Sequence, residues 1–371
     1  MSTKLESEAS LESTVFGFLR RRLTGTKPLP AGIQLTDQVA IVTGSSVGLG
    51  LEASRQLLQL GLSRLIMGVR SQVKGDAAAA QLRSAFPSAT ISVWTVDRES
   101  YDSIRAFADQ CATLLRIDIE ILNAGFMNTP YTTVAATKHE ITMLVNYLSM
   151  ALLAILLLPI LRAKRVAGAA RPPVLTLVGS DAAYGADIET AGPVLQQFDK
   201  PKAFSQFPWY SKSKLLLVLF VSKLAELVSS DEVLVNMANP GMARGTAFFR
   251  GVPTVLLKLV AVVRFLLARL AAVGATTYIN AAVAQGKESH GAFTTDWTIK
   301  PYPKFCYTLE GKEVREKLWK ETLEELNFAG ILKVTETVIV TESSEVADAA
   351  RQIATTPHAT CYSAAQEAAG L

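Results

Sequence analysis

The sequence contains little cysteine and little histidine. Its 371 residues include 3 cysteines and 3 histidines. The cysteines (Cys111, Cys306 and Cys361) are odd in number and far apart, so no disulfide framework is expected and a reducing compartment is favoured. The histidines are equally scattered, which leaves no local spacing for a metal cluster. The sequence therefore predicts neither a disulfide-stapled secreted domain nor a metal site.

An excess of one charge sign is also missing. The chain carries 37 basic and 33 acidic residues, a net charge of +4, and the basic residues are scattered along it. This pattern gives no electrostatic footprint for nucleic acid, and no nucleic-acid-binding module is recognisable. The N-terminus has no apolar core of a signal peptide and does not resemble a transit peptide. We therefore expect a cytoplasmic protein whose partner is a small molecule.

Long uninterrupted hydrophobic runs are absent as well. The apolar run 148–161 has 14 residues and contains Pro159, whereas a membrane-spanning helix needs about 20 apolar residues. The run 252–273 is longer but is interrupted by three basic residues. No transmembrane span is expected, although 252–273 would allow a helix lying on a membrane surface.

What is present is a regular alternation of short β-branched runs with longer amphipathic ones, in a chain of 49% apolar and 19% charged residues. Strand–helix alternation predicts a parallel sheet with helices on both faces, a Rossmann-type doubly wound α/β fold. The predicted strands cover residues 38–44, 64–70, 90–97, 117–125, 173–180 and 233–241.

The same pattern predicts one domain with an extension at each end. The segments are a helical N-terminal extension (1–35), a nucleotide-binding catalytic domain (36–300) with substrate loops 181–207 and 242–274, a C-terminal helical extension (301–330) and a loosely ordered tail (331–371).

The first predicted strand ends in the glycine-rich stretch TGSSVGLG. Gly44, Gly48 and Gly50, with Ser46 and Leu49 between them, lie between this strand and a predicted helix. Glycines here permit a tight turn and bring backbone N–H groups close to a pyrophosphate at the helix N-terminus. The alternative is a glycine-rich turn without a ligand.

The end of the second strand indicates which dinucleotide is bound. A site for NAD usually has an acidic residue about 20 residues after the glycines, which binds the ribose 2′-hydroxyl. Arg70 is found 20 residues after Gly50. An arginine fork suits a 2′-phosphate, so Arg70 favours NADP(H).

The stretch PWYSKSK places one tyrosine among two lysines. On a helix, residues four apart share a face and residues two apart do not. Tyr210 and Lys214 can therefore act together, whereas Lys212 cannot join them. A charged Lys214 beside Tyr210 would favour the tyrosinate and lower the tyrosine pKa. Taken alone, the pair could also be ordinary surface residues.

These motifs together resemble the short-chain dehydrogenase/reductase superfamily over about residues 36 to 300. The resemblance implies a catalytic set of Asn146, Ser180, Tyr210 and Lys214. Tyr210 would exchange the proton with the substrate oxygen, Ser180 would hold that oxygen, Lys214 would also bind the nicotinamide ribose, and Asn146 would hold a water. The further cofactor-binding residues that it implies are Asp97, Asn123, Ala124, Gly125, Pro240 and Gly241.

Two further stretches, ESHGAF (288–293) and the segment 300–326, are similar to reductases of fungal natural-product pathways. This likeness implies an NADP-dependent oxidoreductase that interconverts a ketone and a secondary alcohol on a bulky aromatic or polyketide-derived molecule. It also allows a homodimer through helices around 146–161 and 210–227. The aromatic and apolar residues expected around the substrate are Phe204, Phe207, Trp209, Met242, Phe248 and Phe249.

Three alternatives remain open at this point. The same scaffold could act on a C=C bond or dehydrate its substrate. The protein could bind NADP as a sensor without turnover, although a sensor has no need of a proton donor. It could also be a membrane-surface protein built around 252–273.

Overall fold

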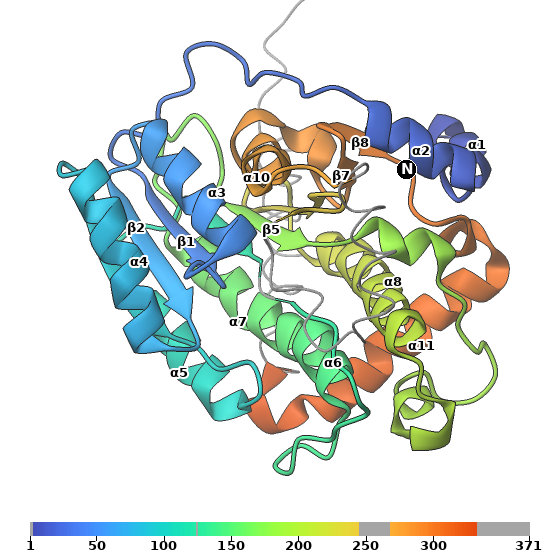
Figure 1. The fold of residues 1–371 in the computed structure, drawn as a ribbon. Coiled ribbons are helices and arrows are strands. Elements are labelled where there is room, and N and C mark those ends of the chain that lie inside the picture. The colour runs from blue at the N-terminus through green and yellow to red at the C-terminus, as the bar shows by residue number, and fades with distance from the viewer. Residues whose placement is uncertain (1–2, 124, 245–267, 332–371) are drawn as a thin grey trace, which may run out of the picture.

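The computed structural model describes residues 3–123, 125–244 and 268–331 (Figure 1). In these residues one sheet has the strand order β3-β2-β1-β4-β5-β6-β7-β8, parallel throughout except for the antiparallel pair β7–β8. The predicted Rossmann-type fold is confirmed. The strands are β1 (Val39–Thr43), β2 (Arg64–Val69), β3 (Thr90–Thr95), β4 (Ile119–Leu122), β5 (Val174–Val178), β6 (Leu234–Asn239), β7 (Phe293–Thr295) and β8 (Thr298–Lys300).

Helices cover both faces of the sheet (Figure 1). The helices are α1 (Thr3–Glu12), α2 (Val15–Leu23), α3 (Gly48–Gln59), α4 (Gln72–Ala85), α5 (Tyr101–Ala112), α6 (Ile141–Met143), α7 (Ser149–Ala163), α8 (Gln206–Leu224), α10 (Ala271–Ile279) and α11 (Leu309–Glu325). π-helical turns cover Leu144–Leu148 and Asn280–Ala284. Short 3₁₀ turns lie at Asp181–Gly185, Leu195–Asp199, Pro201–Ala203, Ala225–Leu227, Lys287–Ser289, Lys304–Tyr307 and Asn327–Ala329.

The alternation of side chains along the strands divides the core into two layers. On β1, Ile41 packs into the layer formed with α5, α7, α8 and α11, while its neighbours Ala40 and Val42 pack into the layer formed with α3, α4 and α10. All three are fully buried. Strands buried on both faces read as continuous apolar runs, which is why the sequence pattern predicts them well.

The strand order reverses at β1, which has β2 on one side and β4 on the other. In doubly wound sheets the ligand binds beyond the carboxyl ends of the strands at such a reversal. The glycine stretch after β1 and Asn123 after β4 both lie there. The fold therefore brings together motifs that are about 80 residues apart in the chain.

The β7–β8 hairpin is missing from the sequence-based prediction. Each strand has only three residues. The turn residues Asp296 and Trp297 have φ values of 52° and 59°. Turns with positive φ at both central residues usually have the sequence Asn-Gly or Asp-Gly, which is absent here. Tertiary contacts stabilise the turn: Asp296 pairs with Arg269 at 2.6 Å, and the indole N–H of Trp297 donates to Thr276 at 2.7 Å.

The apolar helical stretch around α7 is longer than the sequence run suggests. It extends over Ile141–Ala163, and it is the helix in the described residues that is long and apolar enough to cross a membrane. Most of it is buried inside the protein, between α5 and the sheet. Its hydrophobicity is therefore accounted for by the core.

Helix α11 covers part of the surface that the sequence prediction assigns to a dimer. Trp319 of α11 stacks on Phe220 of α8 with ring centroids 5.6 Å apart, and Thr322 hydrogen-bonds the Tyr147 hydroxyl at 2.6 Å. Along α8, residues 215 to 221 are all buried within this one chain. The part of α8 that faces α11 is therefore packed within this chain.

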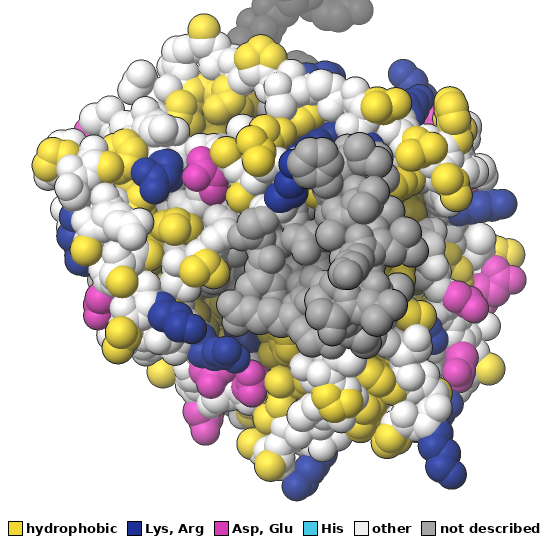
Figure 2. Space-filling model, in the orientation of Figure 1, with side chains coloured by type: hydrophobic (Ala, Val, Ile, Leu, Met, Phe, Trp, Pro, Cys, Tyr) yellow, Lys and Arg dark blue, Asp and Glu magenta, His cyan; other side chains and the backbone are white. Residues whose placement is uncertain are grey.

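The segment 252–273 lies mainly outside the described residues. Its last part is not the continuous helix that the sequence suggests: Arg269 forms a bridge with Ala243, and α10 begins at Ala271. The Arg269 side chain is 8% exposed and paired with Asp296, so it does not face a lipid surface. On the face drawn in Figure 2, basic and acidic side chains are interspersed among apolar ones.

Candidate active site

The loop after β1 adopts left-handed backbone conformations that favour glycine. Gly44 and Gly48 have φ values of 65° and 62°, in the left-handed region. Helix α3 follows, and its N-cap residue Val47 makes no side-chain cap hydrogen bond, whereas Ser71 and Ser100 cap α4 and α5 with their side chains. The first N–H groups of α3 therefore suit an anionic ligand.

Gly50 is a glycine because neighbouring groups pack too closely against it to leave room for a side chain. A Cβ at this position would lie 2.5 Å from the Gly44 carbonyl oxygen and 2.6 Å from Asn123 Nδ2. Both groups are held, because Asn123 Nδ2 donates to the carbonyl oxygens of Thr43 (3.1 Å) and Gly44 (3.3 Å). Ser46 and Leu49 lie half-buried in the same loop.

Gly50→Ala is expected to lower the free energy of unfolding by about 1–3 kcal/mol, because the methyl group must displace fixed backbone. It should also weaken dinucleotide binding. Urea unfolding and fluorescence titration with NADPH measure the two effects. Gly25→Ala is the matched control, since a Cβ there meets no atom within 4 Å; equal stability of the two variants would contradict this account of the loop.

Thr43, at the end of β1, links the loop to a buried arginine. Its hydroxyl accepts hydrogen bonds from the backbone N–H of Asn123 at 3.1 Å and from Arg98 Nη2 at 2.8 Å. Burial lowers the pKa of Arg98 to about 10, and the nearby Glu120 carboxyl opposes this shift. Sequence reasoning missed Arg98; its only signal is its place directly after Asp97.

The ends of β2 and β3 carry the residues expected around the adenosine half of a dinucleotide. The Arg70 side chain is 71% exposed, and Nη1 lies 2.9 Å from Glu99 Oε1. Asp97 is half-buried and accepts the Glu99 backbone N–H at 3.0 Å. An exposed ion pair of this kind is weak, so Arg70 remains available to a phosphate.

Tyr210 and Lys214 lie one turn apart on α8, as their spacing predicts. Both are buried, 7% and 3% exposed, and Lys214 Nζ is 5.9 Å from the centre of the Tyr210 ring. Lys214 Nζ donates to the Val178 carbonyl oxygen at 2.9 Å. Lys212 instead turns away to Trp209, 5.6 Å from its ring centre.

Asn146 lies in the π-helical turn before α7, a distortion often found at functional sites. Its Oδ1 accepts the Phe126 N–H at 3.0 Å, and its Nδ2 donates to the Phe126 carbonyl oxygen at 2.8 Å and to Ser213 Oγ at 3.2 Å. A Cβ on Gly125 would lie 3.2 Å from Asn146 Oδ1 and 3.4 Å from Lys214 Nζ. Asn146 thus lies beside Lys214, and its hydrogen bonds to Phe126 anchor the chain after β4. Ala124, which was also expected to bind the cofactor, is outside the described residues.

Ser180 and the Pro240-Gly241 turn follow the neighbouring strands β5 and β6. Ser180 hydrogen-bonds Tyr210, and its Oγ also accepts the Ala182 N–H at 3.2 Å. Gly241 has φ 69°, and its N–H donates to Asn239 Oδ1 at 3.0 Å. A Cβ on Gly274 of α10 would lie 2.8 Å from Leu49 and 3.4 Å from Pro240, which places this turn near the glycine loop.

The electrostatics of the pair differ from the expectation that the lysine lowers the tyrosine pKa. Burial raises the pKa of Tyr210, a hydrogen bond with Ser180 opposes the rise, and Asp181 adds to it. Burial also lowers the pKa of Lys214 to about 7, with the positive charge of Arg98 acting in the same direction. The protein's own groups therefore keep Tyr210 protonated at neutral pH.

The aromatic residues expected around the substrate do not all gather there. Trp209 packs between Phe198 and Phe204, with ring centroids 5.7 and 5.6 Å away, and belongs to the core. Phe207 is 59% exposed. Met242 is half-buried in the turn after Gly241. Phe248 and Phe249 are outside the described residues.

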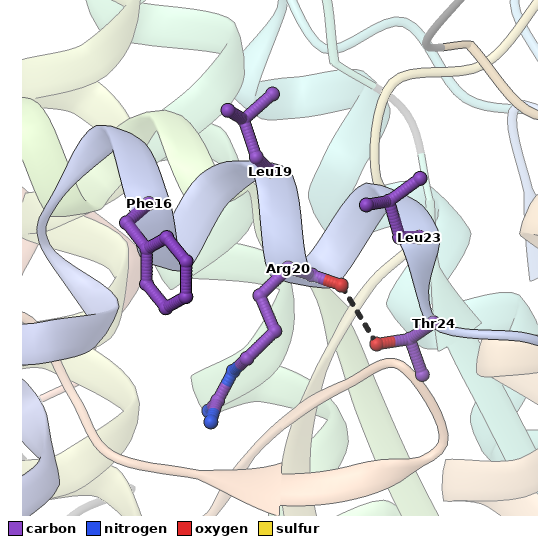
Figure 3. A pocket seen from close by; sticks show the side chains of 5 residues that line it. All are labelled: Phe16, Leu19, Arg20, Leu23 and Thr24. Carbon is purple, nitrogen blue, oxygen red and sulfur yellow. Dashed lines mark hydrogen bonds between the residues drawn. The ribbon is translucent and has the colours of Figure 1, made fainter.

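Sequence reasoning predicted a helical N-terminal extension but missed its contact with the site. Arg22 of α2 pairs with Asp181, directly after Ser180, and its guanidinium lies against Gly241. On the outer side of α2, Phe16, Leu19 and Leu23 surround a hollow of about 450 Å³ (Figure 3). The three consecutive arginines at 20–22 are the only sequence signal for this contact.

Comparison with known proteins supports the family suggested by these motifs. Residues 38–170 match the family model described as short chain dehydrogenase. The short chain dehydrogenase virL of Hypocrea virens is 62% identical over 334 residues, which cover 90% of this chain and 98% of that protein. The short chain dehydrogenase/reductase mfmJ of Annulohypoxylon moriforme is 44% identical over 83% of this chain and 90% of its own.

Solved structures show the same fold at low identity. The L-sorbose reductase of Gluconobacter frateurii has a TM-score of 0.54 at 20% identity and covers 71% of this chain and 97% of its own. The NADPH-dependent 3-quinuclidinone reductase of Rhodotorula rubra has a TM-score of 0.55 at 18% identity and covers 77% and 99%. Fold, motifs and relatives agree, and the chain belongs to the short-chain dehydrogenase/reductase family of oxidoreductases.

Proposed function

We propose that the protein is a cytoplasmic, NADP(H)-dependent reductase that converts a ketone on a bulky, aromatic or polyketide-derived molecule into a secondary alcohol. The observation that carries this proposal is the buried Tyr210 hydroxyl, hydrogen-bonded by Ser180 and one helical turn from Lys214. A protonated phenol suits transfer of a proton to a carbonyl oxygen. The likeness of the stretches 288–293 and 300–326 to reductases of fungal natural-product pathways supports the substrate class.

The residues around the glycine loop fit a dinucleotide. The absence of a Cβ on Gly50 lets the loop close against Gly44 and Asn123, and the N-terminus of α3, which has no side-chain cap, offers N–H groups to a pyrophosphate. Arg70 would take the 2′-phosphate, and Lys214 would hold the nicotinamide ribose beside Tyr210. NADPH, when bound, supplies the hydride that the carbonyl carbon accepts.

The protein's part in the reaction concerns the oxygen of that carbonyl. Ser180 would donate a hydrogen bond to the oxygen and hold it beside the Tyr210 hydroxyl. As negative charge develops there, Tyr210 would transfer its proton to the oxygen, which yields the alcohol and a tyrosinate. Lys214 would stabilise the tyrosinate, and Asn146, beside Lys214, would support the water that returns the proton.

The choice of NADPH supports reduction as the direction, because that nucleotide pool is generally kept reduced. Burial raises the pKa of Tyr210, so its phenol is protonated at neutral pH and a proton donor is present. The Ser180–Tyr210 hydrogen bond also favours chemistry at an oxygen over reduction of a C=C bond or loss of water. A proton donor has no use in a sensor that binds NADP without turnover.

The first experiment is a titration of the purified protein with NADPH and with NADH, followed by reduced-nicotinamide fluorescence. Tight NADPH and weak NADH binding would support the cofactor proposal and lead to turnover assays with aryl ketones. If neither nucleotide bound, the proposed function would fail.

Arg70→Asp is expected to weaken NADPH binding roughly tenfold or more, a loss of about 1.4 kcal/mol or more, because a carboxylate repels the 2′-phosphate. NADH binding should change little or improve. Arg105→Asp is a matched control, since Arg105 is half-exposed on α5 and pairs within its own helix with Asp102. Unchanged NADPH affinity in Arg70→Asp would contradict the choice of NADP(H).

A further inference from the structure

Arg22 comes from α2, far along the chain from the catalytic motifs, yet its side chain is only 2% exposed. Its Nη2 pairs with Asp181, the residue after Ser180. A Cβ on Gly241 would lie 3.2 Å from Arg22 Cζ, so the guanidinium rests directly on the turn after β6. Arg22 therefore lies beside both segments that flank the proposed reaction centre.

Two nitrogen donors of the guanidinium have no acceptor in the part of the chain that the structure describes. Among the described residues, neither Nη1 nor Nε of Arg22 has a hydrogen-bond partner, although both are buried. An unsatisfied buried donor on a charged group costs a few kcal/mol. An acceptor oxygen of a bound molecule would remove that cost.

The surrounding charges favour an anion. The cluster of Arg21, Arg22 and Lys300, all less than one-fifth exposed, is paired with two carboxylates, Glu12 and Asp181. Three cations against two anions leave one positive charge. Arg20, which also contacts Glu12, is 45% exposed, so its charge is solvated.

We infer that Arg22 is a specificity residue of the substrate site, and that the substrate carries a carboxylate that Arg22 binds through Nη1. This inference rests on the proposed function, because it takes Ser180 and Tyr210 as the place of the reacting carbonyl. The N-terminal helices then form part of the site: Glu12 and Arg21 hold α2 in position, and Arg22 recognises the acid.

The test uses matched pairs of aryl ketones: benzoylformate, 3-acetylbenzoate and 4-acetylbenzoate, each with its methyl ester. Binding of each to the enzyme–NADP⁺ complex is measured by calorimetry, where no hydride can be transferred to a ketone. The full-length protein is compared with Arg22→Gln, which removes the charge, and with Arg22→Lys, which keeps it. Arg20→Gln on the outer side of α2 is the control (Figure 3).

For at least one pair, the acid should bind the wild type about tenfold or more tightly than the ester. This ratio should fall to about one in Arg22→Gln, persist in part in Arg22→Lys and remain in Arg20→Gln. The Kd for NADPH should stay within about twofold in all variants. The acid-to-ester ratio cancels intrinsic differences between the ketones.

Three results would overturn the inference. The first is that no acid binds the wild type more tightly than its ester, which includes the case in which no acid binds. The second is an acid preference that survives in Arg22→Gln, and the third is a tenfold weaker NADPH Kd in Arg22→Gln, which would assign Arg22 to the cofactor. If Arg22→Gln does not fold, a lack of acid preference in the wild type still overturns the inference, and so does an acid preference that Arg22→Lys leaves unchanged. Failure of the proposed function is distinguishable, because it appears as absent nucleotide binding before any ketone is added.

Discussion

Tyr210→Phe is expected to lower kcat for ketone reduction by about a thousandfold, within the range that positioned acid–base groups contribute. The variant removes one oxygen from a ring that is already buried, so the Kd for NADPH should stay within about twofold. Stopped-flow reduction and nucleotide titration measure the two quantities. Loss of chemistry with retained binding is what a proton donor predicts.

A tyrosine elsewhere provides the control. Tyr131 is also partly buried, and its hydroxyl donates to the Phe198 carbonyl oxygen at 3.3 Å and not to a residue of the catalytic set. Tyr131→Phe should leave kcat nearly unchanged. If Tyr210→Phe retained most of the wild-type rate, another group would have to supply the proton and the proposed mechanism would be wrong.

Lys214→Met should lower kcat by about a hundredfold or more and, unlike Tyr210→Phe, also weaken NADPH binding, because the ammonium is proposed to hold the ribose and stabilise the tyrosinate. Its effect on stability has a definite pH dependence. The pKa of Lys214 falls from 10.5 to about 7 on folding. Between these values the unfolded state binds more protons, so the free energy of unfolding contributed by this group rises with pH.

Between pH 7 and pH 9 this rise amounts to about 2 kcal/mol. Lys214→Met lacks it, so the stability of the wild type relative to the variant should increase by that amount over this range. Urea unfolding at several pH values measures the difference, and subtraction cancels groups such as Glu120, whose pKa burial raises. Lys212→Ala should show neither effect; parallel pH profiles for the wild type and Lys214→Met would contradict a buried lysine of low pKa.

The α/β fold and the parallel strands β1 to β6 could be predicted because their signals are local. Buried strands are continuous apolar runs, and the tight approach at Gly50 requires a glycine that is visible in the sequence. The spacing of Tyr210 and Lys214 sets their common face on α8, since helix geometry is the same in every protein. Helix geometry also places Lys212, two residues from each, on a different face of α8 from Tyr210 and Lys214.

The β7–β8 hairpin could not be predicted, because its turn depends on Arg269 and Thr276, which are distant in sequence. Pairing of α7 and α8 across a dimer stays a prediction, because apolar residues on α8 look alike whether another subunit or α11 covers them. The direction of the Tyr210 pKa shift is a further case. It depends on burial and on Asp181, neither of which the i, i+4 spacing reveals.

The sequence by itself determined the order of the elements, the glycine loop and the identity of the Tyr210–Lys214 pair, because each depends on neighbours within one strand or one helical turn. Tertiary structure alone decided which distant groups meet them. Arg22 reaches Asp181 across 159 residues of chain, and Arg98 reaches Thr43 across 55. Such contacts arise when whole helices and strands pack against one another, and local residue patterns do not predict which elements will meet.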